Sequence, residues 1–149
     1  MGGVSVSGSR YFLDRVSERQ KRLFIEELYG LYADGVSELH HGDAIGADAF
    51  AHQIAVSLGM RIVVHPPENN RHRAFCSDGL VSILPTKPYL ERNVDLVTST
   101  DILLVLPIQN TEFQRSGTWH TVRVARRNNR SMIIFFPDGR VFRNNIQHK

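Results

Sequence analysis

Apolar residues along this chain fall into two patterns, and each pattern predicts one kind of element. Strands buried on both faces of a sheet are continuous apolar runs, and the chain has three, at Ile62-Val63-Val64 within a strand over residues 61–65, at 102–106 and at 132–136. Shorter strands are predicted at residues 4–7 and 38–41, with a short edge strand at residues 141–143. Between the strands, apolar residues recur three or four positions apart, which predicts helices at residues 17–34, 47–58, 89–100 and 118–129.

The alternation of strands with helices predicts an α/β fold. Its leading form is a Rossmann-like doubly wound parallel sheet in three layers, α/β/α, with about five main strands in the order 3-2-1-4-5. In that order the first and fourth strands are neighbours where the topology switches. Residues 68–87 show no sustained period and are predicted as a long loop. At 149 residues, the chain is predicted to be one domain, 1–149.

Composition and charge narrow the class of protein. The single cysteine, Cys76, excludes an internal disulfide and suits a reducing compartment. No apolar run approaches the roughly 20 residues of a membrane span, and the first residues lack the features of a signal peptide. We therefore expect a cytoplasmic protein with no membrane partner. Net charge is only +3, and the four arginines at positions 123, 126, 127 and 130 favour a solvated helix face over a nucleic-acid site.

Three polar loops follow strands whose carboxyl ends meet at one edge of the predicted sheet. They are Gly8-Ser9-Arg10, residues 41–48 and residues 109–118. Ligands of doubly wound sheets bind in the crevice at this edge. The third loop enters a helix through Ser116-Gly117-Thr118, where free backbone N–H groups and the helix dipole favour an anion. An ordinary N-cap at this turn is the structural alternative. Together the loops predict a site for a phosphate-bearing ligand.

With these motifs in place, the chain resembles the SLOG superfamily of small Rossmann-like proteins. This superfamily includes the LONELY GUY phosphoribohydrolases, lysine-decarboxylase-like proteins, molybdenum-cofactor carriers, the DNA-processing protein A fold and nucleotide-sensing domains of phage-defence systems. The similarity extends from Val4 to Phe136. It depends on the order and spacing of four motifs, which are Gly8-Ser9-Arg10, His41-Gly42-Asp43 with Gly46-Ala47-Asp48, Tyr89-Leu90-Glu91-Arg92-Asn93, and Ser116-Gly117-Thr118.

The resemblance implies a nucleotide-derived ligand at the rim of the sheet. Its phosphates would lie at the backbone of Gly117 and Thr118, and its ribose at Asp43. Arg10 and Arg115 would add donors to the phosphates. Asp43 as an N-cap of the following helix is the structural alternative. The ligand-binding residues predicted in this way are Gly8, Ser9, Arg10, Gly42, Asp43, Gly46, Arg92, Asn93, Arg115, Ser116, Gly117, Thr118 and His120.

One departure from the family bears on activity. The phosphoribohydrolases carry the motif PGGxGTxxE, whose glutamate helps to cleave an N-glycosidic bond. Here Thr121 stands at the position of that glutamate, and a longer loop replaces PGG. Breaking this bond needs a carboxylate. Arg92 matches the arginine of the family's second motif and Glu91 lies beside it, so these two are the candidates for catalysis if the protein is an enzyme.

Binding without turnover is therefore the favoured function. The protein would hold an ADP-ribose-type or cyclic signalling nucleotide as a carrier, sensor or sequestering sponge, for example as a phage antagonist of antiviral nucleotide signalling. A nucleoside-phosphate N-glycosidase is the first alternative. A module that binds single-stranded DNA through the arginines from 123 to 130 is the second.

We expect no cofactor and no metal. His40 and His41 are adjacent on a predicted strand, so their side chains point to opposite faces. Family members commonly associate through helices beside the site, and a homodimer or larger homo-oligomer is therefore expected.

Overall fold

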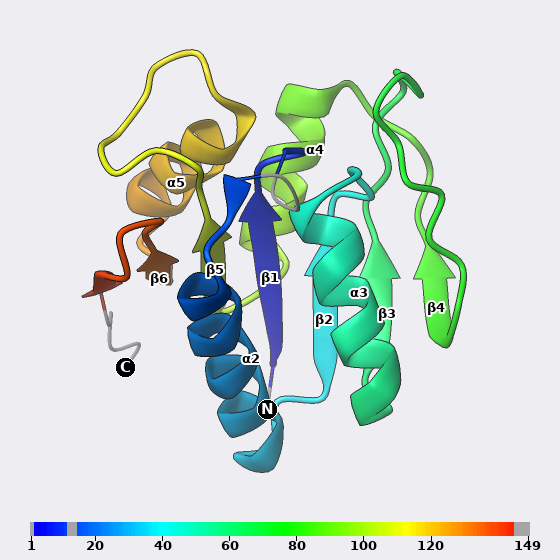
Figure 1. Cartoon of the computed structure of the whole chain (residues 1–149). Helices are drawn as coiled ribbons and strands as arrows, with labels where there is room; N and C mark the ends of the chain where they lie inside the picture. Colours follow the sequence, from blue (N-terminus) through cyan, green and yellow to red (C-terminus); the bar gives the residue numbers. More distant parts are fainter. Residues whose placement is uncertain (1, 12–14, 145–149) are drawn as a thin grey trace.

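The computed structural model describes residues 2–11 and 15–144, and its strands and helices alternate along the chain (Figure 1). The strands are β1 (Gly3–Gly8), β2 (Glu38–His41), β3 (Arg61–Val64), β4 (Leu80–Ile83), β5 (Ile102–Leu106), β6 (Ser131–Phe135) and β7 (Val141–Asn144). The helices are α2 (Glu18–Ala33), α3 (Ala47–Leu58), α4 (Tyr89–Thr98) and α5 (Gly117–Arg127). Every element predicted from the apolar pattern is found, with small differences at the ends. Within the described ranges, none of the helices is both long and apolar enough to cross a membrane.

One seven-stranded sheet runs through the described residues, in the order β4-β3-β2-β1-β5-β6-β7. All neighbouring strands are parallel except β6 and β7, which are antiparallel. The five central strands of the sheet, β3-β2-β1-β5-β6, have the predicted order. β1 lies beside β5 at the predicted switch point, with Val4 opposite Ile102. The α/β class and the doubly wound topology are confirmed.

The expectation of about five strands is corrected to seven. One addition, β7, is the edge strand predicted at residues 141–143. The other, β4, lies within residues 68–87, which the sequence predicts as a loop. Most of its side chains are exposed, and only Val81 packs against the core. Its sequence, Leu80-Val81-Ser82-Ile83, is mostly apolar but short and interrupted by Ser82, so it does not show the continuous apolar run of a strand buried on both faces.

Helices cover both faces of the sheet, α2 and α3 on one face and α4 and α5 on the other (Figure 1). Leu104 of β5 packs in the cluster beneath α2 and α3, whereas its neighbours Leu103 and Val105 pack in the cluster beneath α4 and α5. Because successive side chains of a strand point to opposite faces, both faces of β5 need apolar residues. This double burial explains the continuous apolar run.

The loops that follow β1 and β2 are joined at the carboxyl edge of the sheet. The backbone N–H of Ala47 donates to the carbonyl oxygen of Ser9 at 3.1 Å. Gly46 has a φ of +91°, and a Cβ atom there would lie 2.5 Å from the Ser9 oxygen and 2.6 Å from the Arg10 oxygen. A Cβ atom on Gly8 would lie 2.3 Å from the Cβ atom of Ala47. The two glycines therefore allow α3 to begin directly against the end of β1.

The segment between β3 and β4 folds back over the loop that follows β2. The N–H of Ile45 donates to the carbonyl oxygen of His72 at 2.9 Å, and the N–H of Ala74 donates to the carbonyl oxygen of Asp43 at 2.7 Å. Residues that the sequence predicts as part of a long loop thus form part of the carboxyl edge.

Candidate ligand-binding site

A cavity of about 490 Å³ opens at the carboxyl edge of the sheet. The three polar loops identified in the sequence line it, together with α4 and the segment between β3 and β4. Arg10 and Thr118, far apart in the chain, therefore face one space. The predicted site residues that line this cavity are Gly8, Ser9, Arg10, Gly42, Arg92, Asn93, Arg115, Ser116, Gly117 and Thr118. The other three, Asp43, Gly46 and His120, are not among its lining residues.

The start of α5 forms one wall of the cavity. Ser116 is the N-cap, with an extended backbone at φ −133° and ψ 130°, and its hydroxyl accepts the Trp119 N–H at 3.3 Å. The first N–H groups of a helix have no intrahelical partner. Those of Gly117 and Thr118, which no described residue accepts, are therefore free for an anion. Ser116 is thus the N-cap of the structural alternative, and the next two amides stay candidate donors to an anion.

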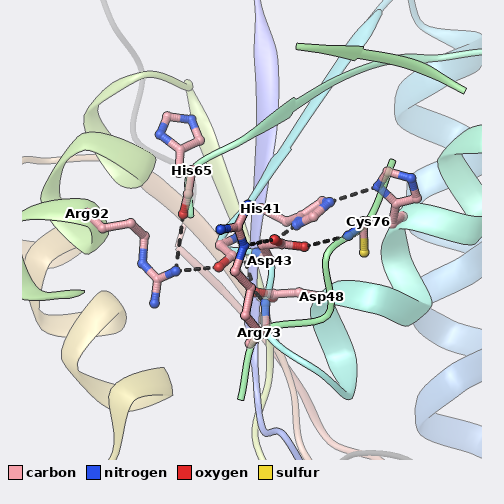
Figure 2. Close-up of polar contacts among 10 residues, drawn as sticks. His41, Asp43, Asp48, His65, Arg73, Cys76 and Arg92 are labelled. Atoms are coloured by element: carbon pink, nitrogen blue, oxygen red, sulfur yellow. Dashed lines mark hydrogen bonds and ion pairs between the residues drawn. The ribbon is translucent and has the colours of Figure 1, made fainter. Parts of the chain in front are cut away.

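Arg92 of α4 reaches across the edge of the sheet to the loop after β2 (Figure 2). Its Nη1 donates to the carbonyl oxygens of Gly42 and, at 3.2 Å, of His65. A Cβ atom on Gly42 would lie 2.6 Å from Nη1, so only glycine lets the guanidinium lie against this backbone. The Nε of Arg92 donates to Asn93 Oδ1 at 2.9 Å, and the Asn93 amide contacts the His120 ring at 3.1 Å. His120 thus lies behind Asn93 and supports it.

The structure places Asp43 away from the cavity, which corrects its predicted role. Its side chain is fully buried, and both oxygens are used within the chain: Oδ2 accepts from Arg73 Nε at 2.7 Å and Oδ1 accepts the Cys76 N–H at 2.9 Å (Figure 2). The N-cap of α3 is Gly46, so Asp43 is not the cap either. The physical reason is the left-handed backbone of Asp43, at φ 60°, which directs its carboxylate to the segment between β3 and β4.

Asp48 faces the cavity instead, a residue that the sequence marked only as part of a motif. It lies in the first turn of α3 and is 5% exposed. Its Oδ2 accepts the N–H groups of Gly42 at 3.1 Å and Ala44 at 3.2 Å. Its Oδ1 is buried and has no hydrogen-bond partner among the described residues. The one signal for Asp48 in the sequence was its place as an acidic residue in the first turn of a helix. That signal does not single out a site, because the helix dipole favours acidic residues there in any helix.

The electrostatics of Asp48 reflect its surroundings. Burial raises its pKa to about 6, while Arg92 and the two backbone N–H groups oppose that rise. Burial also lowers the pKa of Arg92, and the neighbouring carboxylates oppose that shift. Both side chains contact Gly42, but no ion pair joins them. They are therefore two separate polar groups on the wall of the cavity.

Positive charge dominates the lining of the cavity. Four arginines contribute to it, at positions 10, 71, 92 and 115, against one acidic residue, Asp48. Arg10, Arg71 and Arg115 are exposed, whereas Arg92 is partly buried. A concave surface lined mostly by one sign of charge concentrates ligands of the opposite sign. The cavity therefore suits an anion.

A cluster of His41, His52 and Cys76 brings potential metal ligands within 4.8 Å of one another. Its hydrogen bonds oppose metal binding. His41 Nδ1 accepts the Asp43 N–H at 2.9 Å, so a neutral His41 carries its proton on Nε2, which donates to His52 Nδ1 at 2.9 Å. Burial lowers the pKa of His41 to about 3 and raises that of the Cys76 thiol to about 12. Ligation would require breaking this pattern and deprotonating Cys76, so the cluster serves to join β2, α3 and the following segment.

The predicted catalytic carboxylate does not reach the cavity. Glu91 is exposed and is not a lining residue. Thr121, which stands in place of the family's glutamate, is 1% exposed, and its hydroxyl donates to the Thr118 carbonyl oxygen at 2.6 Å. Within the described part of the chain, Asp48 is the only carboxylate that lines the cavity.

The arginine-rich face of α5 is partly neutralised. Arg123 and Arg126 pair with Glu112 at 3.3 and 3.2 Å. Arg130, just beyond the helix, donates to the carbonyl oxygen of Thr98 at 3.2 Å. These contacts are typical of a solvated helix face and do not favour a nucleic-acid site.

Comparison with known proteins finds likeness at the level of structure. No family model matches the chain, and no curated protein matches it significantly. The X-ray structure of TM1055 is similar with a TM-score of 0.65 and 18% sequence identity, over 89% of this chain and 72% of that one. The Moco carrier protein from Chlamydomonas reinhardtii is similar with a TM-score of 0.63 and 17% identity, over 89% and 75%. DNA processing protein A (DprA) from Streptococcus pneumoniae follows with 0.62 and 21%, over 90% of this chain and 50% of DprA.

These likenesses confirm the Rossmann-like fold that the SLOG resemblance implied. At such low sequence identity they show the fold alone. A carrier protein and a DNA-processing protein share it, so the fold does not choose between small-molecule and nucleic-acid binding. That choice depends on the cavity.

Proposed function

We propose that this chain binds an anionic, nucleotide-derived small molecule in the cavity at the carboxyl edge of its sheet. The observation that carries the proposal is the meeting of two free helix amides, at Gly117 and Thr118, with four arginines around one cavity. Helix amides and arginine side chains are donors well suited to phosphate groups. Arg10 and Arg115 remain the proposed side-chain contacts to the phosphates.

The size and lining of the cavity favour a nucleotide over a lone phosphate ion. Its volume of about 490 Å³ lies within the range of about 300–1,000 Å³ for small-molecule sites. Apolar and aromatic side chains, including Tyr89, Leu96 and Ile108, line other parts of it. Such side chains offer surfaces on which a base or the carbon face of a sugar packs.

Binding without turnover is the favoured form of this function, because the glutamate of the phosphoribohydrolases is replaced by the buried Thr121. The protein would act as a carrier, sensor or sequestering sponge for an ADP-ribose-type or cyclic signalling nucleotide. A phage antagonist of antiviral nucleotide signalling is one concrete version. The fold likeness to a Moco carrier protein supports a small-molecule carrier in general terms.

Isothermal titration calorimetry tests the proposal, with a panel of mononucleotides, ADP-ribose isomers and cyclic dinucleotides. We expect at least one compound to bind, and Arg115→Ala to weaken it. Arg61→Ala is the matched control, because Arg61 is also exposed but lies at the amino end of β3, at the opposite edge of the sheet. Absence of binding across the whole panel would overturn the proposal.

A nucleoside-phosphate N-glycosidase is the second candidate, and Asp48 is the observation that favours it. A buried carboxylate whose pKa is about 6 is suited to general acid–base catalysis near neutral pH. Incubation with nucleoside monophosphates, followed by chromatography, separates the two candidates. Release of free base that Asp48→Asn abolishes would favour the enzyme, and binding without release would favour the carrier.

A further inference from the structure

We propose that Asp48 is a specificity-determining residue, whose Oδ1 accepts a hydrogen bond from a sugar hydroxyl of the ligand. The site would thereby prefer ribose-bearing compounds to their deoxy counterparts. This inference rests on the proposed function, and it assigns to Asp48 the contact that the sequence assigned to Asp43.

The first argument is the state of the Asp48 carboxylate. The N–H groups of Gly42 and Ala44 hold Oδ2 in place, while Oδ1 has no partner in the described structure, although the residue is only 5% exposed. Leaving a buried charged oxygen without a partner is costly. A residue of this kind at the wall of a cavity is poised to accept a hydrogen bond from whatever fills that cavity.

The second argument is that the neighbouring cation does not satisfy Oδ1. Nη1 of Arg92 donates to the carbonyl oxygens of Gly42 and His65. Figure 2 shows the guanidinium directed to these carbonyl groups, and no ion pair joins it to Asp48 although both side chains lie beside Gly42. Oδ1 therefore has no partner among the described residues, and Arg92 stabilises the negative charge from nearby.

The third argument concerns the chemistry of the ligand. An ionised carboxylate only accepts hydrogen bonds, so the group that meets Oδ1 must be a donor. The arginines and the start of α5 select an anion, whose phosphate oxygens cannot donate. A phosphate-bearing compound with hydroxyl groups on its carbon skeleton meets both requirements, and the ribose of a nucleotide is such a skeleton. The raised pKa of Asp48, about 6, still leaves the carboxylate mainly ionised at pH 7.

Calorimetry with matched ligands tests this inference at pH 7.5. AMP and ADP-ribose are titrated first, and the tighter binder is then compared with its 2′-deoxy and 3′-deoxy counterparts. We expect at least one deoxy compound to bind about 10- to 100-fold more weakly, as expected for loss of a hydrogen bond to a charged group. In Asp48→Asn, whose amide oxygen can still accept the Gly42 and Ala44 N–H groups, this ratio should approach one.

The control is Glu18→Gln, which also changes an acidic residue in the first turn of a helix, on α2, and should keep the wild-type ratio. Equal binding of ribo and deoxy compounds by the wild-type protein would overturn the role of Asp48 while leaving the proposed function intact. An undiminished ratio in Asp48→Asn would do the same. Failure of the wild-type protein to bind either AMP or ADP-ribose would overturn the inference together with this choice of ligand. If Asp48→Asn does not fold, the comparison of ligands on the wild-type protein still decides.

Discussion

Gly117→Pro is the sharpest test of the anion site, because it removes one backbone donor with little other change. Gly117 is the first residue of α5, where its N–H has no intrahelical partner. Proline is favoured at this position of a helix. The preceding residue, Ser116, already has the extended backbone that proline requires, at φ −133° and ψ 130°. No atom lies within 4 Å of a Cβ atom built on Gly117, so the variant should fold.

The expected loss follows from the chemistry of the donor. A hydrogen bond to a charged group contributes about 1.5–3 kcal/mol, so ligand affinity should fall roughly 10- to 100-fold. Gly117→Ala is the matched control, since it keeps the N–H and places a methyl group in open space. Calorimetry with the tightest ligand of the panel measures affinity, and urea unfolding checks that both variants are at least as stable as wild type. Equal affinity of the two folded variants would refute the anion site at α5.

Three further predictions follow from the same structure. Asp43→Asn breaks an ion pair whose carboxylate is fully buried, so the free energy of unfolding in urea should fall by about 3 kcal/mol, while Asp138→Asn, at an exposed pair, should change little. The folded pKa values of His41 and His65 are about 3 and 4, so below pH 6.5 these residues bind protons in the unfolded chain first, and stability falls as the pH drops. The pKa of Asp48 is raised to about 6 in the folded protein, so its protonation opposes this fall. Near pH 5, unfolding takes up a net one proton across these three groups, so the free energy of unfolding should change by about 1.4 kcal/mol per pH unit. Asp48→Asn should roughly double this slope, measured by urea unfolding at several pH values. An unchanged slope would contradict the raised pKa of Asp48. If the basic face of α5 bound single-stranded DNA, affinity would fall steeply with salt; we expect weak binding in fluorescence anisotropy at physiological salt, and light scattering tests the expected homodimer or larger assembly.

The sheet could be predicted from the sequence because double burial leaves a direct mark. The strand from Ile102 to Leu106 packs on both faces, and its apolar run has no polar interruption. The strand from Leu80 to Ile83 is exposed along most of its length. Its pairing with β3 depends on backbone hydrogen bonds, which any residue except proline can make. Three of its four residues are apolar, but the strand is too short and too exposed to give the continuous run of a strand buried on both faces.

The site was predictable as a place but not in each of its residues. Parallel topology alone brings Arg10 and Thr118 to one edge, and both do line the cavity. Asp43, in the loop after β2, and Asp48, in the first turn of α3, are five positions apart and are chemically identical. Which carboxylate reaches the cavity depends on the positive φ of Asp43 and on the two backbone N–H groups that hold Asp48. Such backbone geometry has no signature in a single sequence when the residue is not glycine.

The junction between Gly46 and the residues after β1 constrains how this protein accommodates what it binds. A Cβ atom is excluded at Gly46, and the Ala47 N–H donates directly to the Ser9 carbonyl oxygen. The loops after β1 and β2 therefore form one rigid wall of the cavity. Ligands of different size would therefore be accommodated at the opposite wall, by residues 109–116, which contain no helix or strand. Such a protein would discriminate between ligands at the rigid wall and tolerate variation between them at residues 109–116.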